Sequence, residues 1–400
     1  MTPARPLAAI SLPPFLRDRR YLANALGHTS IDVLTSCVSL LLAWLSLPLG
    51  LSNTAIGLIA TGFTFANALT QPIFGWMSDR RGPHYLAAGG AVWIAAFFAL
   101  SALVSGRNPW LAIVFLIVSA LGSGAFHPEG AVNARRVPLA QATTATAVFF
   151  LFGQMGSGVG PSLAGSLVDA WGPAGLLALA LLTLLTGLWM WRQRPLPRRQ
   201  HERTPAATRP LVLRLGRLSL VFFAMLLFTR MTVQSTTVTF LPKHLQDLGW
   251  SPSAYGVALS VVIIGGAFGN VVGGSLADRV GRWQVVIGSM FLTAPFVWLY
   301  LDAHGPAFYV LLFLAGLCVT AGHSINVVMA QAMLPGRQGL ASGLVLGFMF
   351  ASGAVGAAVA GWLGDRIGLA AVLPGLALVA VIGGLFALAL PRDFYRADAH

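Results

Sequence analysis

The chain has 400 residues, of which 56% are hydrophobic and only 9% are charged. Soluble domains carry roughly 25% charged residues, so this composition excludes a water-soluble surface and indicates that lipid is the solvent. The formal net charge of +13 would suit a nucleic-acid-binding protein, but the basic residues fall in short segments between apolar runs. They therefore indicate orientation in a membrane, and no nucleic-acid partner is expected.

Twelve apolar segments are long enough to span a lipid bilayer, which takes about 20 residues. Six precede residue 193, at 21–46, 54–78, 84–106, 109–134, 141–167 and 172–192. Six follow residue 214, at 215–242, 253–277, 283–303, 305–332, 338–362 and 368–390. We predict an all-α membrane protein with twelve transmembrane helices, the first of them a retained helix and not a cleaved signal peptide.

A polar segment divides these helices into two groups of six. From Arg192 to Pro210 it holds six arginines and four prolines, which cannot lie in hydrocarbon. The predicted domains are an N-terminal bundle at 1–192, a basic cytoplasmic linker at 193–214 and a C-terminal bundle at 215–400. With the N-terminus in the cytoplasm, 21 of the 25 Lys and Arg residues lie on the cytoplasmic side. This bias predicts that both termini and the linker lie in the cytoplasm.

The two groups repeat one another. At an offset of 199 residues the matched pairs are Gly57 and Gly256, Gln71 and Asn270, Gly75 and Gly274, Asp79 and Asp278, Arg80 and Arg279, and Gly82 and Gly281. At an offset of 196 they are Gly160 and Gly356, Gly165 and Gly361, Asp169 and Asp365, and Gly172 and Gly368. Six spans is an even number, so the halves are parallel repeats. This architecture is typical of transporters with a substrate path between the halves.

The loop signature at Gly75, Asp79, Arg80 and Gly82, with its second copy at Gly274, Asp278, Arg279 and Gly281, resembles that of the major facilitator superfamily. Pro83 and His84 depart from it, because they replace the usual basic pair. The resemblance implies a cytoplasmic gate. Asp79 can face the N-terminus of the span beginning near residue 338, where a carboxylate is favoured by about 0.3–1 kcal/mol. The alternative is that these charges only end the helix among the headgroups.

Two further motifs narrow the resemblance. Gly156, Gly160, Pro161 and Gly165 look like the antiporter motif of exporters in the superfamily, although a packing kink without directional meaning is the alternative. The stretch from Phe126 to Gly130, together with His28, Asp32 and Arg230, resembles the fosmidomycin-resistance branch. That resemblance implies an exporter of small drugs in the plasma (inner) membrane, driven by protons. The alternative function is a proton symporter that takes up an organic anion, and sodium coupling is left open.

The residues support such coupling independently. Ionisable groups within spans cost roughly 2.5–3.5 kcal/mol, and therefore mark a pathway. His28 and Asp32 are four residues apart on one helix face. Asp32 and Arg230 lie centrally in repeat-related spans, and could pair across the cavity as a coupling device or as a static packing contact.

The remaining candidates lie in other spans. His127 precedes and Glu129 follows a helix distortion at Pro128. Both could carry protons, or Glu129 could instead pair with Arg135 or Arg136. The substrate-binding candidates are the ionisable, amide and aromatic side chains Arg230, Gln154, Gln234, His323, Asn326 and Phe126. A histidine such as His323 could also serve packing alone.

Other function classes fit poorly. The sequence shows no catalytic constellation, metal cluster or phosphate-binding loop. We therefore expect that the protein is not an enzyme, that it binds no metal or cofactor, and that an ion gradient supplies its energy. A passive channel would need rings of like groups. The expected partners are a small-molecule substrate, protons and the lipid bilayer, and the expected state is a monomer.

Overall fold

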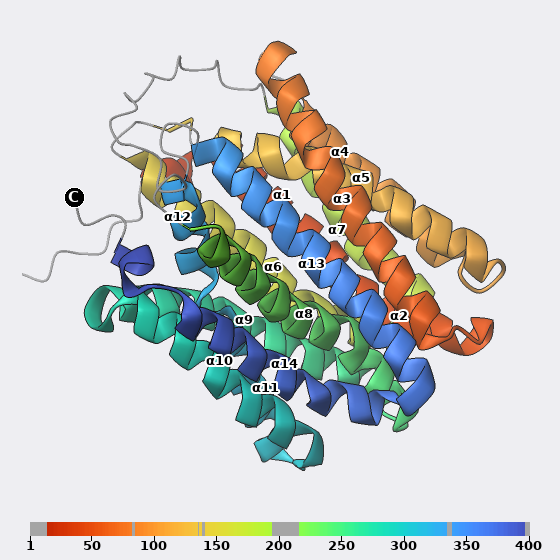
Figure 1. Cartoon of the computed structure of the whole chain (residues 1–400). Helices are drawn as coiled ribbons and strands as arrows, with labels where there is room; N and C mark the ends of the chain where they lie inside the picture. The colour runs from red at the N-terminus through yellow and green to blue at the C-terminus, as the bar shows by residue number, and fades with distance from the viewer. Residues whose placement is uncertain are drawn as a thin grey trace, which may run out of the picture.

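The computed structural model describes residues 14–81, 85–134, 136–137, 141–193, 216–333 and 338–396, and within this part of the chain every regular element is helical (Figure 1). The N-terminal half contains η1 Pro14–Arg17, α1 Arg19–Ser36, α2 Val38–Leu49, α3 Asn53–Arg81, α4 Leu86–Val104, α5 Pro109–Ala134, α6 Ala142–Trp171, η3 Gly172–Leu176 and α7 Leu177–Arg192. The C-terminal half contains α8 Arg217–Asp247, α9 Pro252–Val280, α10 Arg282–Leu299, η5 Tyr300–Asp302, α11 Pro306–Ala321, α12 His323–Met333, α13 Gln338–Ile367, α14 Leu369–Ala389 and η6 Arg392–Arg396.

The helices follow the predicted spans in order. Only Cys37 separates α1 from α2, and only Gly322 separates α11 from α12, so each of these pairs corresponds to one span. Among the described residues, ten stretches are long and apolar enough to cross a membrane, and one of them, Thr144–Arg192, covers most of α6 and all of α7. The prediction of an all-α membrane protein is confirmed, and the helices are consistent with twelve spans.

Glycine and polar residues set the helix ends. Gly50 ends α2 in the left-handed backbone conformation, with φ of 57°. Residues that carry a Cβ adopt this conformation only at a cost in free energy. Ser251 caps α9, since its side chain accepts a hydrogen bond from the Ala254 amide, and Pro252 suits the first helical turn because its missing N–H would be unpaired there. These short breaks allow the chain to reverse at the membrane surface.

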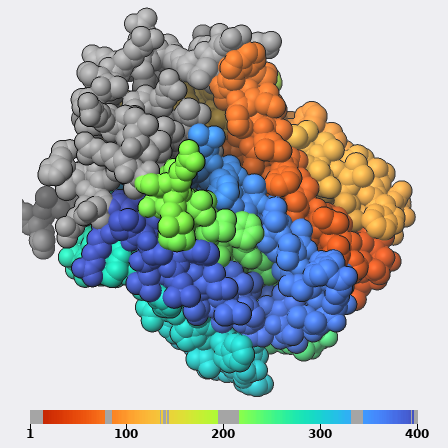
Figure 2. Space-filling model, viewed as in Figure 1, coloured from red at the N-terminus to blue at the C-terminus, as the bar shows by residue number. Residues whose placement is uncertain are grey.

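The two halves meet through repeat-related helices. α3 packs on α13, and α6 packs on α9. Figure 2 shows α3 and α13 side by side at the surface. We call the end of the molecule where α3 and α9 begin, and α6 and α13 end, the outer end. The orientation predicted from the arginines would place it outside the cytoplasm.

Close glycine contacts bring the halves together near the outer end. A Cβ at Gly57 would lie 2.8 Å from the Ala357 carbonyl oxygen, and a Cβ at Gly256 would lie 3.2 Å from the Pro161 carbonyl carbon. Residues without a side chain therefore allow the backbones of opposite halves to touch, as in other tightly packed membrane helices. Gly57 and Gly256 are partners in the sequence repeat, so the same close approach is built twice.

Candidate functional site

The N-terminal half holds a compact cluster of His28, Asp32 and His127. His28 and Asp32 lie one turn apart on α1, and their Nε2 and Oδ2 atoms are 3.4 Å apart. Nε2 of His127, from α5, lies 3.3 Å from Oδ1 of Asp32. The side chains of His28, Asp32 and His127 are 3%, 16% and 25% exposed. His127 and Asp32 are thus partly exposed, while His28 is buried.

Backbone carbonyls fix the tautomer of both imidazoles. Nδ1 of His28 is 2.8 Å from the Phe149 carbonyl oxygen, and Nδ1 of His127 is 2.8 Å from that of Ser123. A carbonyl only accepts hydrogen bonds, so each Nδ1 carries the hydrogen. A neutral ring would then turn the Nε2 lone pair toward the Asp32 carboxylate. Each contact becomes attractive only when a proton lies between the nitrogen and the oxygen, which is the arrangement that a proton-carrying site requires. The proton-carrying role of these residues stays a prediction.

Helix α6 supports this cluster. The ring of His28 stacks on Phe149 with a centroid distance of 4.2 Å. A Cβ at Gly153 would lie 2.5 Å from Nε2 of His28 and 2.8 Å from Oδ2 of Asp32. No side chain fits there, so Gly153 is a residue of the site that the sequence analysis missed. The same three ionisable groups place one ligand atom each within 4.8 Å of one another, a spacing that one cation could also bridge.

Glu129 has a different partner. Its side chain is fully buried, and Oε1 is 3.4 Å from Nη2 of Arg136. From the sequence, Glu129 was expected either to carry protons or to pair with a nearby arginine, and the contact with Arg136 is such a pair. Arg135, the other partner considered, lies outside the described residues. The proton-carrying role of Glu129 stays a prediction.

The predicted pair of Asp32 and Arg230 is wrong. Arg230 is 1% exposed, its Nε donates to the Val319 carbonyl at 2.7 Å, and its Nη1 is 3.4 Å from Nδ1 of His323. Asp32 contacts only histidines of its own half among the described ion pairs. At the repeat offset Asp32 matches Met231 and not Arg230. One residue turns a helical side chain by about 100°, so the two charges face different neighbours.

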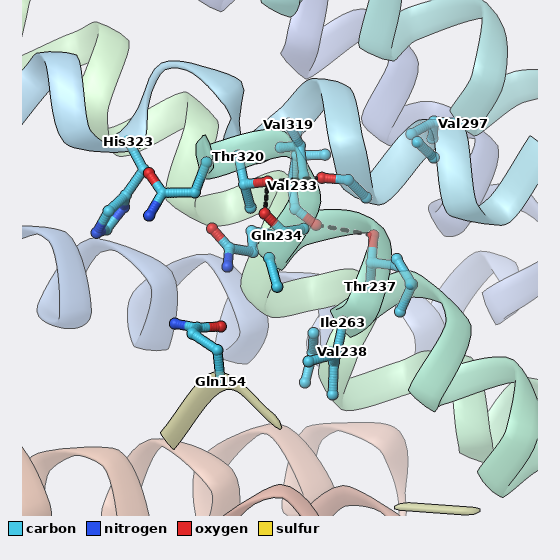
Figure 3. Close-up of a pocket in the computed structure, with 16 residues that line it drawn as sticks. Gln154, Val233, Gln234, Thr237, Val238, Ile263, Val297, Val319, Thr320 and His323 are labelled. Atoms are coloured by element: carbon cyan, nitrogen blue, oxygen red, sulfur yellow. Dashed lines mark hydrogen bonds between the residues drawn. The ribbon is translucent and has the colours of Figure 1, made fainter. Parts of the chain in front are cut away.

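A cavity of about 130 Å³ lies beside this arginine, lined by helices α8, α9, α10 and α11, His323 at the start of α12 and one residue of the N-terminal half, Gln154. In Figure 3 Gln154 and Gln234 point toward one another across it. His323 also lines the cavity, and Thr320 beside it donates to the Gly266 carbonyl at 2.6 Å. The cavity therefore offers amide and imidazole groups on otherwise apolar walls, as small-molecule sites do.

The other substrate-binding candidates lie outside this lining. Arg230 is behind His323, Phe126 is fully buried against His28, and Asn326 is fully buried with both side-chain polar atoms unpaired. Asn270, which the sequence analysis noted only as the repeat partner of Gln71, does line the cavity. Its Oδ1 accepts a hydrogen bond from the Ser324 amide at 3.2 Å, and this bond ties α9 to the first turn of α12.

Comparison with known proteins matches each half separately. The sequence profile of the Major Facilitator Superfamily matches residues 25–246 and again residues 222–397. The chain belongs to the major facilitator superfamily. It is therefore a transporter and not an enzyme, and its repeat is the repeat of that fold.

Relatives of this facilitator include the fosmidomycin resistance protein of Escherichia coli, which is 28% identical over 94% of this chain and 93% of its own length. The gentisate transporter of Corynebacterium glutamicum is 26% identical over 78% of this chain and 72% of its own. An inward-facing, occupied bacterial homologue of the lysosomal transporter Spinster superposes with a TM-score of 0.79 at 13% identity, covering 97% of this chain and 99% of that one. The last similarity concerns the fold alone.

The gating-loop residues of this facilitator are described only in part. Gly75 lies in α3, but the side chains of Asp79 and Arg80, and all of Gly82, fall outside the described residues. In the second copy, Asp278, Arg279 and Gly281 line a cavity of about 580 Å³ with Arg282, Trp283 and Arg392, while Gly274 faces open space. Gly281 has φ of 102° and precedes α10. Gating by these loops stays a prediction.

The antiporter-like motif of this facilitator packs α6 against both halves. A Cβ at Gly160 would lie 2.8 Å from the Val33 carbonyl oxygen, and a Cβ at Gly165 would lie 2.9 Å from the Pro252 carbonyl carbon. Gly156 packs in the same way on the backbone of Thr29. Helix α6 continues through Pro161 without interruption. The motif thus has a packing role, and its link to export stays a prediction.

Proposed function

We propose that this facilitator is a proton-coupled exporter (antiporter) of small drug-like or anionic organic molecules, working by alternating access of its two halves. The observation that carries the proposal is the cluster of His28, Asp32 and His127. Both imidazoles direct Nε2 at one carboxylate, with Nδ1 held by backbone carbonyls. The cluster favours a bound proton when closed, and losing a contact would release it.

The cavity supports a separate place for the substrate. It is built almost wholly from the C-terminal half, while the proton cluster lies in the N-terminal half. Helix α6 reaches both, because Gly153 adjoins the cluster and Gln154 lines the cavity. A proton-dependent shift of α6 would then change the cavity, which is the link that an antiporter requires.

Export is favoured over uptake by similarity to a protein named for fosmidomycin resistance. The proposal includes a monomer in the plasma (inner) membrane with both termini in the cytoplasm, and coupling to protons and not to sodium. Arg230 and Asn326 remain substrate-binding candidates, because a conformation that moves α11 or α12 would expose their unpaired groups.

Everted membrane vesicles provide the test. With an acidic interior, we expect an antiporter to accumulate labelled fosmidomycin or gentisate, and a protonophore to abolish the accumulation. Expulsion of both probes under the same gradient would favour the symporter instead. Accumulation driven by a sodium gradient at equal pH on both sides would contradict proton coupling.

A further inference from the structure

Two carboxylates join the halves at the outer end. Asp365, near the end of α13, accepts hydrogen bonds from the amides of Asn53 at 2.7 Å and Thr54 at 2.9 Å, and from the Thr54 hydroxyl. Asp169, near the end of α6, accepts one from the Ser253 amide at 3.0 Å. Each carboxylate belongs to one half, and the helix it caps, α3 or α9, belongs to the other.

The two contacts are copies of one another. Asp169 and Asp365 are 196 residues apart, and Thr54 and Ser253 are 199 apart, the offsets of the two parts of the repeat. Their surroundings repeat as well, because Gly165 packs on Pro252 and Gly361 packs on Asn53. The same carboxylate-to-helix contact therefore occurs on both sides of the interface.

The physics of a helix start explains why a carboxylate suits this place. The first amides of a helix have no partner within it and carry a partial positive charge, which a carboxylate both neutralises and hydrogen-bonds. Because donor and acceptor lie in different halves, these bonds exist only while the halves are together at the outer end. They stabilise the closed outer end relative to the open one, which is the differential contact that a conformational switch needs.

We propose that Asp169 and Asp365 are paired latches that hold the outer end closed, and that both release when this end opens. The latches are unequal. Asp365 accepts from three donors and Asp169 from one, so Asp365 contributes more. Both carboxylates are exposed, so water replaces their partners readily and each latch shifts the balance without locking it.

Spin labels on either side of the interface test the proposal in the full chain. Leu47 on α2 and Leu248 after α8 are 67% and 63% exposed, and Leu47→Cys with Leu248→Cys reports the outer-end distance in nanodiscs. Cys37 and Cys318 are buried, and their labelling is measured in the chain without added cysteines. We expect Asp365→Asn to raise the open-to-closed ratio roughly two- to fivefold and Asp169→Asn less. The double variant should combine both effects, because the sites are separate.

Two further variants test whether loss of these particular carboxylate contacts causes the shift in the open-to-closed ratio. Asp302→Asn removes an exposed carboxylate in η5, on the C-terminal half alone, and should leave the distance distribution unchanged. Asp365→Glu keeps the charge and should restore much of the closed population. An unchanged distribution in the double variant at unchanged melting temperature would overturn the proposal, as would an equal shift in Asp302→Asn. The measurement uses no substrate and no proton gradient, so it stands apart from the outcome for proton coupling.

Discussion

Among the described residues, Asp32 is the only one whose carboxylate lies between two histidines. An amide in its place keeps the shape but has no negative charge to share a proton with either imidazole. We expect Asp32→Asn to lower gradient-driven transport by at least about tenfold, and to leave exchange of substrate across the membrane without a gradient largely intact. Vesicle flux with and without a pH gradient measures both. Loss of both activities together would show that Asp32 serves folding or substrate binding instead.

Arg230 should behave differently, because it contacts Val319 and His323 and not Asp32. We expect Arg230→Met to weaken probe binding through the rearranged His323, while the pH dependence of any remaining transport is unchanged. Substrate titration by intrinsic fluorescence measures probe binding, and flux at several pH values measures the pH dependence of transport. A pH profile altered as in Asp32→Asn would reinstate coupling between these charges.

A single methyl group added at Gly153 tests the geometry of the cluster of His28, Asp32 and His127. Gly153→Ala would press a Cβ against the His28 ring and the Asp32 carboxylate. Gly158→Ala, on the same helix, is a matched control, because its Cβ would lie 2.8 Å from Cγ1 of Ile264 and would meet no group of the cluster. Overpacking of this kind costs about 1–3 kcal/mol. We expect Gly153→Ala to shift the pH profile of transport, with Gly158→Ala close to the native protein. Equal profiles in the two variants would remove Gly153 from the site.

Among the helices, the pairs α3 with α13 and α6 with α9 carry most of the contact between halves. Gly256→Ala in α9 would place a Cβ against the Pro161 carbonyl of α6, while Gly274→Ala, further along α9, meets nothing within 4 Å. We expect Gly256→Ala to destabilise this arrangement by about 1–3 kcal/mol. Its melting temperature should fall below that of Gly274→Ala, which gains slightly from helix propensity. The reverse order would contradict the packing described for this interface.

For the whole molecule, the arginine distribution predicts which end faces the cytoplasm. Asn108 lies exposed at the outer end between α4 and α5, and Arg192 lies exposed at the opposite end of α7. In intact cells, a membrane-impermeant thiol reagent should label Asn108→Cys at once and Arg192→Cys only after the membrane is opened. Labelling in the opposite order would invert the predicted topology.

The sequence by itself determined the membrane class, the two halves and their repeat, because composition and spacing are properties of the chain alone. It also found most of the ionisable and polar groups of the site, since charges in apolar spans stand out without any neighbour. Gly153 was not predicted, because a residue without a side chain gives no indication of which neighbouring groups occupy the space beside it. The partners of Asp32 and Arg230 were decided only by the tertiary structure. A rotation of one residue about a helix axis selects which neighbouring helix a side chain meets, and the repeat does not fix that rotation to better than about 100°.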